Sequence, residues 1–220
     1  MENEKEKQGS RHDAFVDSVI SLCHKEKEVG RSKPFVDYVL ELCQKEKDKK
    51  TGRPEKFVEF VIGLCQKDKG AAAALRSADN PATEHQSWEY LAGFNIDLEK
   101  PFERIPYATI AAAIARAKIE NNGASGIGKA VAFCYEEKNK SEQAKAKLRR
   151  LLACDSVDEV CRILRPLFSL IDSKAAVTLN YSRLLEQLIW FHRDSNSVKT
   201  KWANDFYRHA AETETEEVSA

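Results

Sequence analysis

The sequence predicts an all-α protein. Apolar residues recur three and four positions apart in most windows, which is the spacing of one face of an α-helix. Stretches such as residues 68–78 and 107–120 are rich in alanine, the strongest helix former. No window shows sustained alternation of apolar and polar residues, so we expect no β-sheet.

One segment occurs three times in the first third of the chain. The copies "FVDSVISLCHKEK", "FVDYVLELCQKEK" and "FVEFVIGLCQKDK" begin at Phe15, Phe35 and Phe57. Each predicts an amphipathic helix with a lysine-rich end, and glycine and proline separate the copies. Only the third copy runs directly into the rest of the chain. We therefore interpret residues 1–54 as an extension with two extra copies, either spare helices or a docking element for a partner.

Residues 55–210 predict one all-helical domain, followed by an acidic, disordered tail over residues 211–220. Ser141 is expected to cap one helix, and Ser156 and Glu159 have capping-box spacing at the next. Pro166 should kink or interrupt that second helix. Further helices are predicted over residues 179–192 and 197–212, where Trp202 and Phe206 share one face. With Trp88, Trp190 and Tyr207, these two aromatic residues are expected in the core or at an interface.

Composition excludes several classes of protein. The chain has 220 residues, 42% of them hydrophobic, and no net charge, so it can build a core and shows no overall preference for an acidic or basic partner. It has no apolar run long enough to span a membrane and no signal-like N-terminus, so we expect a cytoplasmic protein. The cysteines lack metal-ligand spacing and are expected to be buried thiols: Cys23, Cys43, Cys65, Cys134, Cys154 and Cys161. His85, His192 and His209 stand apart from any plausible cysteine or serine partner. We therefore expect no catalytic residues, no metal and no cofactor.

The stretch "GASGIGKA" has the glycine and lysine spacing of a phosphate-binding loop at Gly123, Gly128 and Lys129. Such a loop must follow a strand, but a predicted helix comes before it, and Ala130 replaces the Ser or Thr that would bind magnesium. We interpret residues 121–123 as a helix stop. The glycines would then be needed either because the backbone adopts positive φ angles or because two backbone segments approach closely.

Six pieces of the sequence form a recognisable series: "KGAAAALRSADNP", "WEYLAGF", "GIGKAVA", "SEQAKAKLRRLLACDSVDEVCRILRPLFSLI", "LNYSRLLEQLIWF" and "VKTKWANDFY". Taken in this order, they resemble the CasB family, the small subunit of the type I-E CRISPR Cascade surveillance complex. The resemblance covers roughly residues 56–210. Three features depart from it: Leu148 stands where an aromatic residue is expected, Pro166 follows Leu164 and Arg165, and the tandem N-terminal copies have no counterpart.

The resemblance implies a non-catalytic helical bundle that takes part in antiviral defence. Its implied partners are the Cascade backbone and large subunits, a second copy of itself, the crRNA–target DNA heteroduplex and the displaced single-stranded DNA. The subunit would help to assemble the complex and would hold the displaced strand, which stabilises the R-loop.

Holding a displaced strand requires cations spaced along its phosphates. The candidate nucleic-acid-binding residues are Lys129, Arg149, Arg150, Arg165, Lys145, Lys199, Lys201 and Arg76. Helical spacing places Lys145 with Arg149 on one face and Lys147 with Arg150 on another. Since Arg149 and Arg150 cannot point the same way, one is expected to reach nucleic acid while the other pairs with a carboxylate, such as Asp158 or Glu159. Two alternatives remain open: a helical adaptor that contacts only protein, and a nucleotide-dependent enzyme that rests on "GASGIGKA" alone.

Overall fold

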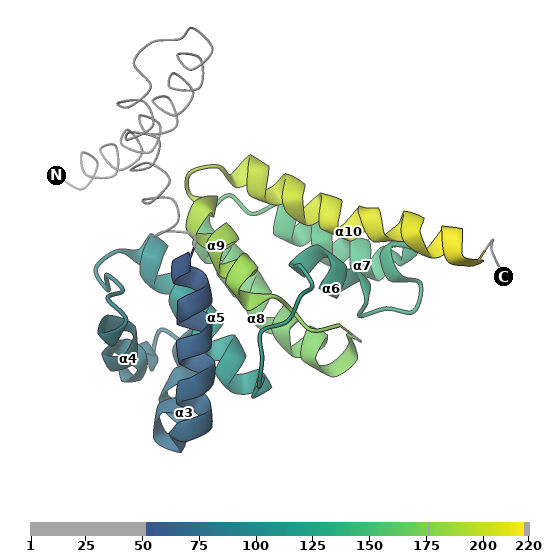
Figure 1. Cartoon of the computed structure of the whole chain (residues 1–220). Coiled ribbons are helices and arrows are strands. Elements are labelled where there is room, and N and C mark those ends of the chain that lie inside the picture. The colour runs from purple at the N-terminus through teal and green to yellow at the C-terminus, as the bar shows by residue number, and fades with distance from the viewer. Residues whose placement is uncertain (1–51, 176, 218–220) are drawn as a thin grey trace, which may run out of the picture. The chain divides into compact units, whose positions relative to one another are not determined.

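The computed structural model describes residues 52–175 and 177–217, and residues 54–220 belong to one unit. Within the described residues every regular element is a helix, and the sole β-type pairing is an isolated parallel bridge between Ser125 and Leu179. This confirms the predicted fold class. A helix over residues 52–67 comes first (Figure 1). The others are α3 (Lys69–Arg76), η1 (Glu84–Ser87), α4 (Trp88–Gly93), α5 (Pro101–Ala117), α6 (Ile127–Ala132), η2 (Lys138–Lys140), α7 (Glu142–Leu152), α8 (Val157–Lys174), α9 (Tyr181–Phe191) and α10 (Ser195–Glu217).

Helix α5 lies at the centre of the fold and packs against α3, α8 and α9. Its residues 106–115 are all buried, as expected for a helix that is apolar around its whole circumference. Small alanine side chains allow neighbouring helices to approach it from several sides. Pro101 opens the helix at a position where a missing N–H costs nothing.

Helix α5 ends earlier than the sequence predicts. Its last residue is Ala117, and Lys118 follows in the left-handed conformation with φ 51°, so the expected stop at residues 121–123 is wrong. Asn122 instead links two segments, because its side chain accepts a hydrogen bond from the Tyr181 N–H at 2.8 Å and donates one to the Ser182 hydroxyl at 2.9 Å. The segment after α5 is therefore held against the start of α9.

The glycines of "GASGIGKA" let two pairs of backbone segments approach closely. A Cβ at Gly128 would lie 2.2 Å from the Trp202 carbonyl oxygen, and one at Gly123 would lie 2.3 Å from that of Thr178. The short helix α6 thus packs directly on α10 (Figure 1). Of the two expected roles, close approach of the backbone explains why glycine stands at positions 123 and 128.

Helix α10 seals the C-terminal part of the core. Val198, Trp202 and Phe206, each four positions apart, are buried, and the Trp202 indole donates a hydrogen bond of 2.8 Å to the buried Gln187 side chain. This confirms the core positions expected for Trp202 and Phe206. The helix continues to Glu217, so the tail does not begin at residue 211 as expected, because the glutamates favour helix. Residues 218–220 lie outside the described part.

Only the third repeat lies within the described residues. It forms the helix over residues 52–67, and Phe57, Val58, Val61 and Ile62 are buried in the core, as its pattern predicts. The other two copies, residues 15–27 and 35–47, lie outside the described residues.

The described cysteines behave as small apolar residues. Cys134, Cys154 and Cys161 are buried, and Cys65 is half-buried. Burial raises the pKa of Cys134 to about 11 and that of Cys161 to about 12, so both thiols are protonated at neutral pH. Cys23 and Cys43 lie outside the described residues. Among the described helices, none combines the length and apolar character that a bilayer-spanning helix needs.

Candidate nucleic-acid interface

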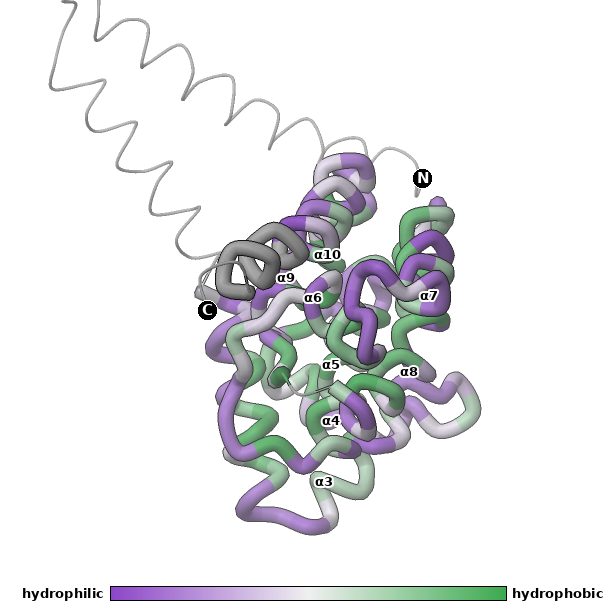
Figure 2. Tube along the Cα trace, turned by 90° about the vertical axis from the view of Figure 1, so that its right-hand side faces the viewer, coloured by the Kyte–Doolittle hydropathy of each residue, from purple (hydrophilic) through white to green (hydrophobic). Residues whose placement is uncertain are grey.

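Helix α7 carries the highest concentration of predicted site residues. Ser141 caps its start by accepting the Ala144 N–H, as predicted, and Glu142 adds a negative charge to the first turn. Arg149 and Arg150 stand in the last turn, where cations favour the helix dipole. Ala144, Leu148 and Leu151 are buried. Along the helix these hydrophobic residues recur between hydrophilic ones (Figure 2). This buried stripe leaves two polar flanks.

The first flank holds Lys145 and Arg149 around one carboxylate. The Lys145 Nζ lies 2.8 Å from Glu142 Oε1, and the Arg149 guanidinium lies 3.5 Å from Glu142 Oε2. The hydrogen bond from Lys145 lowers the pKa of Glu142 below its ordinary value. Both cations thus share a face, as their spacing predicts, but Glu142 offsets part of their charge.

The second flank faces α8 and forms the wall of an open groove. Lys147 and Arg150 from α7 meet Arg162 from α8 there. Among the described residues, no ion pair joins Lys147 or Arg150 to a carboxylate. Arg162 lies 2.9 Å from Asp158 Oδ2, but both side chains are at least half exposed, so this pair is weak. The groove therefore carries excess positive charge.

The floor of this groove is apolar. It is formed by Ile163, Pro166, Leu167 and Leu170 of α8, with Tyr135 at one end, and its volume is about 420 Å³. An adjoining hollow shares Arg150, Arg162 and Ile163 and continues towards Cys154 and Glu159. We call the two together the α7–α8 groove. It has cations along its rim and space above an apolar surface.

Pro166 shapes this floor without ending the helix. Helix α8 runs unbroken from Val157 to Lys174, so the expected interruption does not occur. Pro166 is exposed and lines the groove, and the Arg162 carbonyl that loses its helical donor can be hydrated. At the start of α8, the Ser156 hydroxyl accepts the Glu159 N–H at 3.3 Å, as the capping box predicts. The Glu159 carboxylate reaches back to the N–H of Asp155 at 2.9 Å instead of that of Ser156.

A second basic group lies around Phe133, between α6 and η2. The Nζ atoms of Lys129 and Lys138 lie 5.5 Å and 5.2 Å from the centroid of its ring, within cation–π range. The backbone N–H of Lys129 donates to Asp205 Oδ2 at 2.9 Å. The Lys129 side chain is thus held at the surface while its backbone is fixed to α10.

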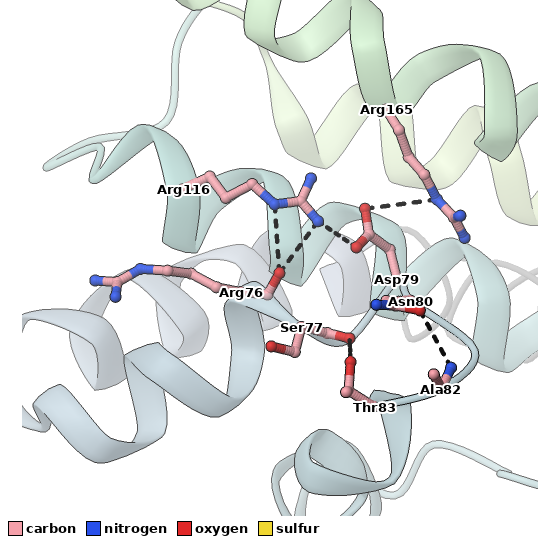
Figure 3. A network of polar contacts seen from close by, with 8 residues as sticks. All are labelled: Arg76, Ser77, Asp79, Asn80, Ala82, Thr83, Arg116 and Arg165. Atoms are coloured by element: carbon pink, nitrogen blue, oxygen red, sulfur yellow. Dashed lines mark hydrogen bonds and ion pairs between the residues drawn. The ribbon is translucent and has the colours of Figure 1, made fainter.

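Arg165 and Arg76 belong to a structural network around a buried carboxylate (Figure 3). Asp79 is 6% exposed and pairs with Arg116, and its other oxygen lies 3.6 Å from the Arg165 Nε. Arg116 also donates to the Arg76 carbonyl at 3.1 Å, while the Arg76 Nε donates to the Ala115 carbonyl at 3.2 Å. These contacts tie α3, α5 and α8 together. Arg165 is thus held inside the fold, whereas Arg76 is exposed and braces the start of the network from the surface.

The two lysines of α10 differ from each other. The Lys199 Nζ lies 3.8 Å from Asp155 Oδ1 and 5.8 Å from the Phe191 ring centroid, and its side chain is largely covered. Lys201 is exposed, and its charge acts on the half-buried Glu186 of α9. Neither residue lines the α7–α8 groove.

One of the two adjacent arginines pairs with a carboxylate, as expected, but the partner differs from the two named examples. Arg149 contacts Glu142, and Asp158 pairs with Arg162 instead. Lys147 and Arg162, which join Arg150 in the groove, are absent from the predicted set. The spacing of Lys147 and Arg150 already placed both on one face, but the partner helix could not be identified from spacing alone.

Two kinds of site that the sequence raises can be checked among the described residues. No group of three metal-ligating side chains occurs among them. At the start of α6, where a phosphate-binding loop would hold its ligand, the Asp205 carboxylate already accepts the Lys129 N–H. The fold and site therefore define an all-helical protein with a cation-rimmed, apolar-floored groove.

Comparison with known proteins identifies the family. Residues 71–207 match the model of the CRISPR-associated protein Cse2. The fold is similar to CasB from M. ruber, with a TM-score of 0.58, 26% identity, and coverage of 74% of this chain and 97% of that one. It also resembles a CRISPR-associated protein of the Cse2 family from Thermus thermophilus, with a TM-score of 0.58, 21% identity, and coverage of 70% and 97%.

A further similar chain belongs to a CRISPR RNA-guided surveillance complex, with a TM-score of 0.59, 19% identity, and coverage of 77% of this chain and 99% of that one. A comparison with curated protein sequences found no match. The chain belongs to the CRISPR-associated Cse2 family, and the resemblance to CasB seen in the sequence is confirmed.

Proposed function

We propose that the chain is the non-catalytic small subunit of a type I-E CRISPR Cascade complex and that its α7–α8 groove binds the displaced DNA strand. The family match over residues 71–207 and the likeness to a chain of a surveillance complex support the assembly. The single observation that supports the DNA-binding role is the convergence of Lys147, Arg150 and Arg162 on one groove.

The physical argument concerns the balance of strand exchange. The guide–target heteroduplex is about as stable as the duplex it replaces, so modest binding of the displaced strand shifts the equilibrium towards the R-loop. Phosphates need cations that are not already neutralised, and Lys147 and Arg150 meet this requirement among the described residues. The groove lining also includes one aromatic ring, that of Tyr135, which is the kind of side chain on which unpaired bases stack. The chain performs no turnover in this role.

This proposal divides the predicted site residues between the nucleic-acid surface and the support of the fold. Arg150 stays at its centre and is joined by Lys147 and Arg162, while Lys129, Lys145 and Arg149 extend the positive surface across α6 and α7. Arg165 and Lys199 serve mainly the fold, because their side chains are largely covered beside carboxylates of this chain. Arg76 also supports the fold, because its guanidinium donates to the Ala115 carbonyl. The backbone and large subunits, a second copy and the heteroduplex are the proposed partners, in the cytoplasm.

A fluorescence-anisotropy titration with a labelled single-stranded oligonucleotide tests the proposal. We expect weak binding without sequence preference that falls steeply as salt is raised. The double variant Lys147→Glu/Arg150→Glu should weaken binding by roughly tenfold and flatten the salt dependence. Arg183→Glu is the matched control, because Arg183 is an exposed cation of α9 that does not line the groove. Equal loss in both variants would contradict a site in the groove.

One observation favours the second candidate, an adaptor that contacts only protein. Four apolar residues form the groove floor, which would suit an amphipathic segment of a neighbouring subunit. Such an adaptor would retain no DNA in the same titration at low salt. In an assembled complex, Leu170→Ala would then weaken subunit association more than Lys147→Glu/Arg150→Glu does.

A further inference from the structure

The third repeat of the chain packs into a defined slot. Phe57 makes edge-to-face contacts with Phe94 and Tyr107, with ring centroids 5.2 Å and 4.7 Å apart. Phe60 stacks on the outer side of Phe94 at 5.5 Å. The Gln66 amide donates to the Glu120 carbonyl at 3.4 Å. We call the surface formed by Phe94, Tyr107 and the Glu120 backbone the repeat slot.

The positions buried in this slot are those that the repeats share. Phe57, Val58, Val61 and Ile62 are at most 7% exposed. Their counterparts in the second repeat are Phe35, Val36, Val39 and Leu40, and in the first they are Phe15, Val16, Val19 and Ile20. The one difference among them is the conservative change of Ile62 to Leu40, whereas exposed Glu59 corresponds to Asp37 and Asp17. The same apolar face is thus encoded three times in one chain, while the slot accommodates one helix.

The second repeat also has side chains of the kind that make contacts at the edges of the slot. Tyr38 stands at the sequence position of Phe60, whose ring stacks on Phe94, and Gln44 stands at that of Gln66. The first repeat has Ser18 and His24 at these positions and lacks both groups. Of the two upstream copies, residues 35–47 therefore match the slot better.

One residue favours the third repeat as the usual occupant. Asp68 caps α3 by accepting the N–H groups of Gly70 and Ala71 at 2.7 Å and 3.1 Å. The second and first repeats have Glu46 and Glu26 at this position, and Glu is not a preferred capping residue. The third repeat is also continuous with α3, so no part of the chain has to form a closed loop when this repeat lies in the slot.

We propose that the repeat slot is a helix-exchange site in which residues 35–47 of the same chain can replace residues 57–69. Residues 48–68 would then form a loop, and the entropic cost of closing a loop grows only slowly with its length. Exchange buries an equivalent apolar face and releases the third repeat. Nothing in this exchange depends on nucleic acid.

Thermal unfolding of full-length variants tests the exchange. Phe57→Asp should lower the melting temperature modestly, because residues 35–47 take the slot, whereas Phe35→Asp alone should leave it unchanged. The double variant Phe35→Asp/Phe57→Asp should melt roughly 5 °C or more below Phe57→Asp. The control Lys45→Asp/Phe57→Asp should melt with Phe57→Asp, because the counterpart Lys67 is exposed. A chain unfolded by Phe57→Asp alone, or a double variant no less stable than Phe57→Asp, overturns the proposal.

Cross-linking gives a readout that does not depend on stability. Gln44→Cys and Glu120→Cys, joined by a short bismaleimide and identified by mass spectrometry, should link within one chain. The yield should rise several-fold when Phe57→Asp is added and be lost when Phe35→Asp is added as well. Failure of Phe57→Asp to raise the yield, or links found only between two chains, overturns exchange within the chain.

Discussion

The Asp205 carboxylate accepts a hydrogen bond of 2.9 Å from the Lys129 backbone N–H, so an acidic side chain of α10 occupies the start of α6. Helix N-termini attract anions, and here the protein supplies its own. The glycines around this contact allow α6 and α10 to approach. A sequence that resembles a phosphate-binding loop therefore makes a helix–helix junction.

We accordingly expect no nucleotide binding at this junction. Millimolar ATP or NAD(H) should leave the melting temperature of the protein unchanged, because Asp205 would repel a phosphate there. Differential scanning fluorimetry with and without each nucleotide checks this. A shift that grows with nucleotide concentration and disappears in a Lys129→Ala variant would contradict it.

Substitution of Gly128 should be strongly destabilising. A Cβ at this position would lie 2.2 Å from the Trp202 carbonyl oxygen and 2.6 Å from the Phe206 nitrogen, and backbone atoms cannot rotate away. We expect Gly128→Ala to cost about 1–3 kcal/mol in the free energy of unfolding, measured by urea denaturation.

Gly63→Ala is the matched control for that substitution. Gly63 lies within the helix over residues 52–67, and nothing lies within 4 Å of an added Cβ. Because alanine favours helix over glycine, this variant should gain about 0.5–1 kcal/mol. A loss in both variants would mean that the contact with α10 does not explain the cost at Gly128.

Removal of the buried carboxylate should loosen the junction of α3, α5 and α8. Asp79→Ala leaves Arg116 and Arg165 without their shared partner, and we expect a loss of about 2–3 kcal/mol in the free energy of unfolding. Asp97→Ala is the control, because Asp97 pairs with Lys100 at 2.6 Å on the exposed surface and its loss should change the free energy of unfolding much less. Similar costs would show that burial does not strengthen the Asp79 network.

High pH should destabilise the fold through its buried thiols. Burial raises the pKa of Cys161 from 9.0 to about 12 and that of Cys134 to about 11, so the folded state keeps protons that the unfolded state loses. Their contribution to stability is complete below pH 9 and is lost as the pH rises through these raised pKa values. Each thiol changes the free energy of unfolding by at most about 1.4 kcal/mol per pH unit.

Urea denaturation at several pH values between 8 and 11 measures this slope. Burial also raises the pKa of Tyr181, which adds to the slope above pH 10. Cys161→Ala should reduce the dependence of stability on pH without removing it. An unchanged slope in that variant would contradict the assignment to Cys161.

Local patterns in the sequence predict much of this fold. Helix caps at Ser141 and Ser156 and the buried face of α10 follow from spacing within a few residues. The end of α5 does not, because Lys118 adopts a positive φ where a glycine would be expected. That conformation is compatible with Asn122 meeting the start of α9, a contact that local spacing cannot reveal.

The candidate site was predictable only in part. Spacing placed Lys147 and Arg150 on one face, but the meeting with Arg162 depends on how α7 packs against α8. Arg165 and Asp79 lie far apart in sequence and meet only when the helices pack together. The sequence alone therefore could not identify Asp79 as the carboxylate that holds this arginine in the fold. Charge content alone could not separate cations that build the protein from those available to a partner.

The cap that Asp68 provides also marks where the last repeat joins the rest of the domain. Because α3 receives its first two capping hydrogen bonds from that residue, the third repeat cannot be shortened at its end without uncapping the next helix. A deletion that stops before residue 52 would leave this joint in place.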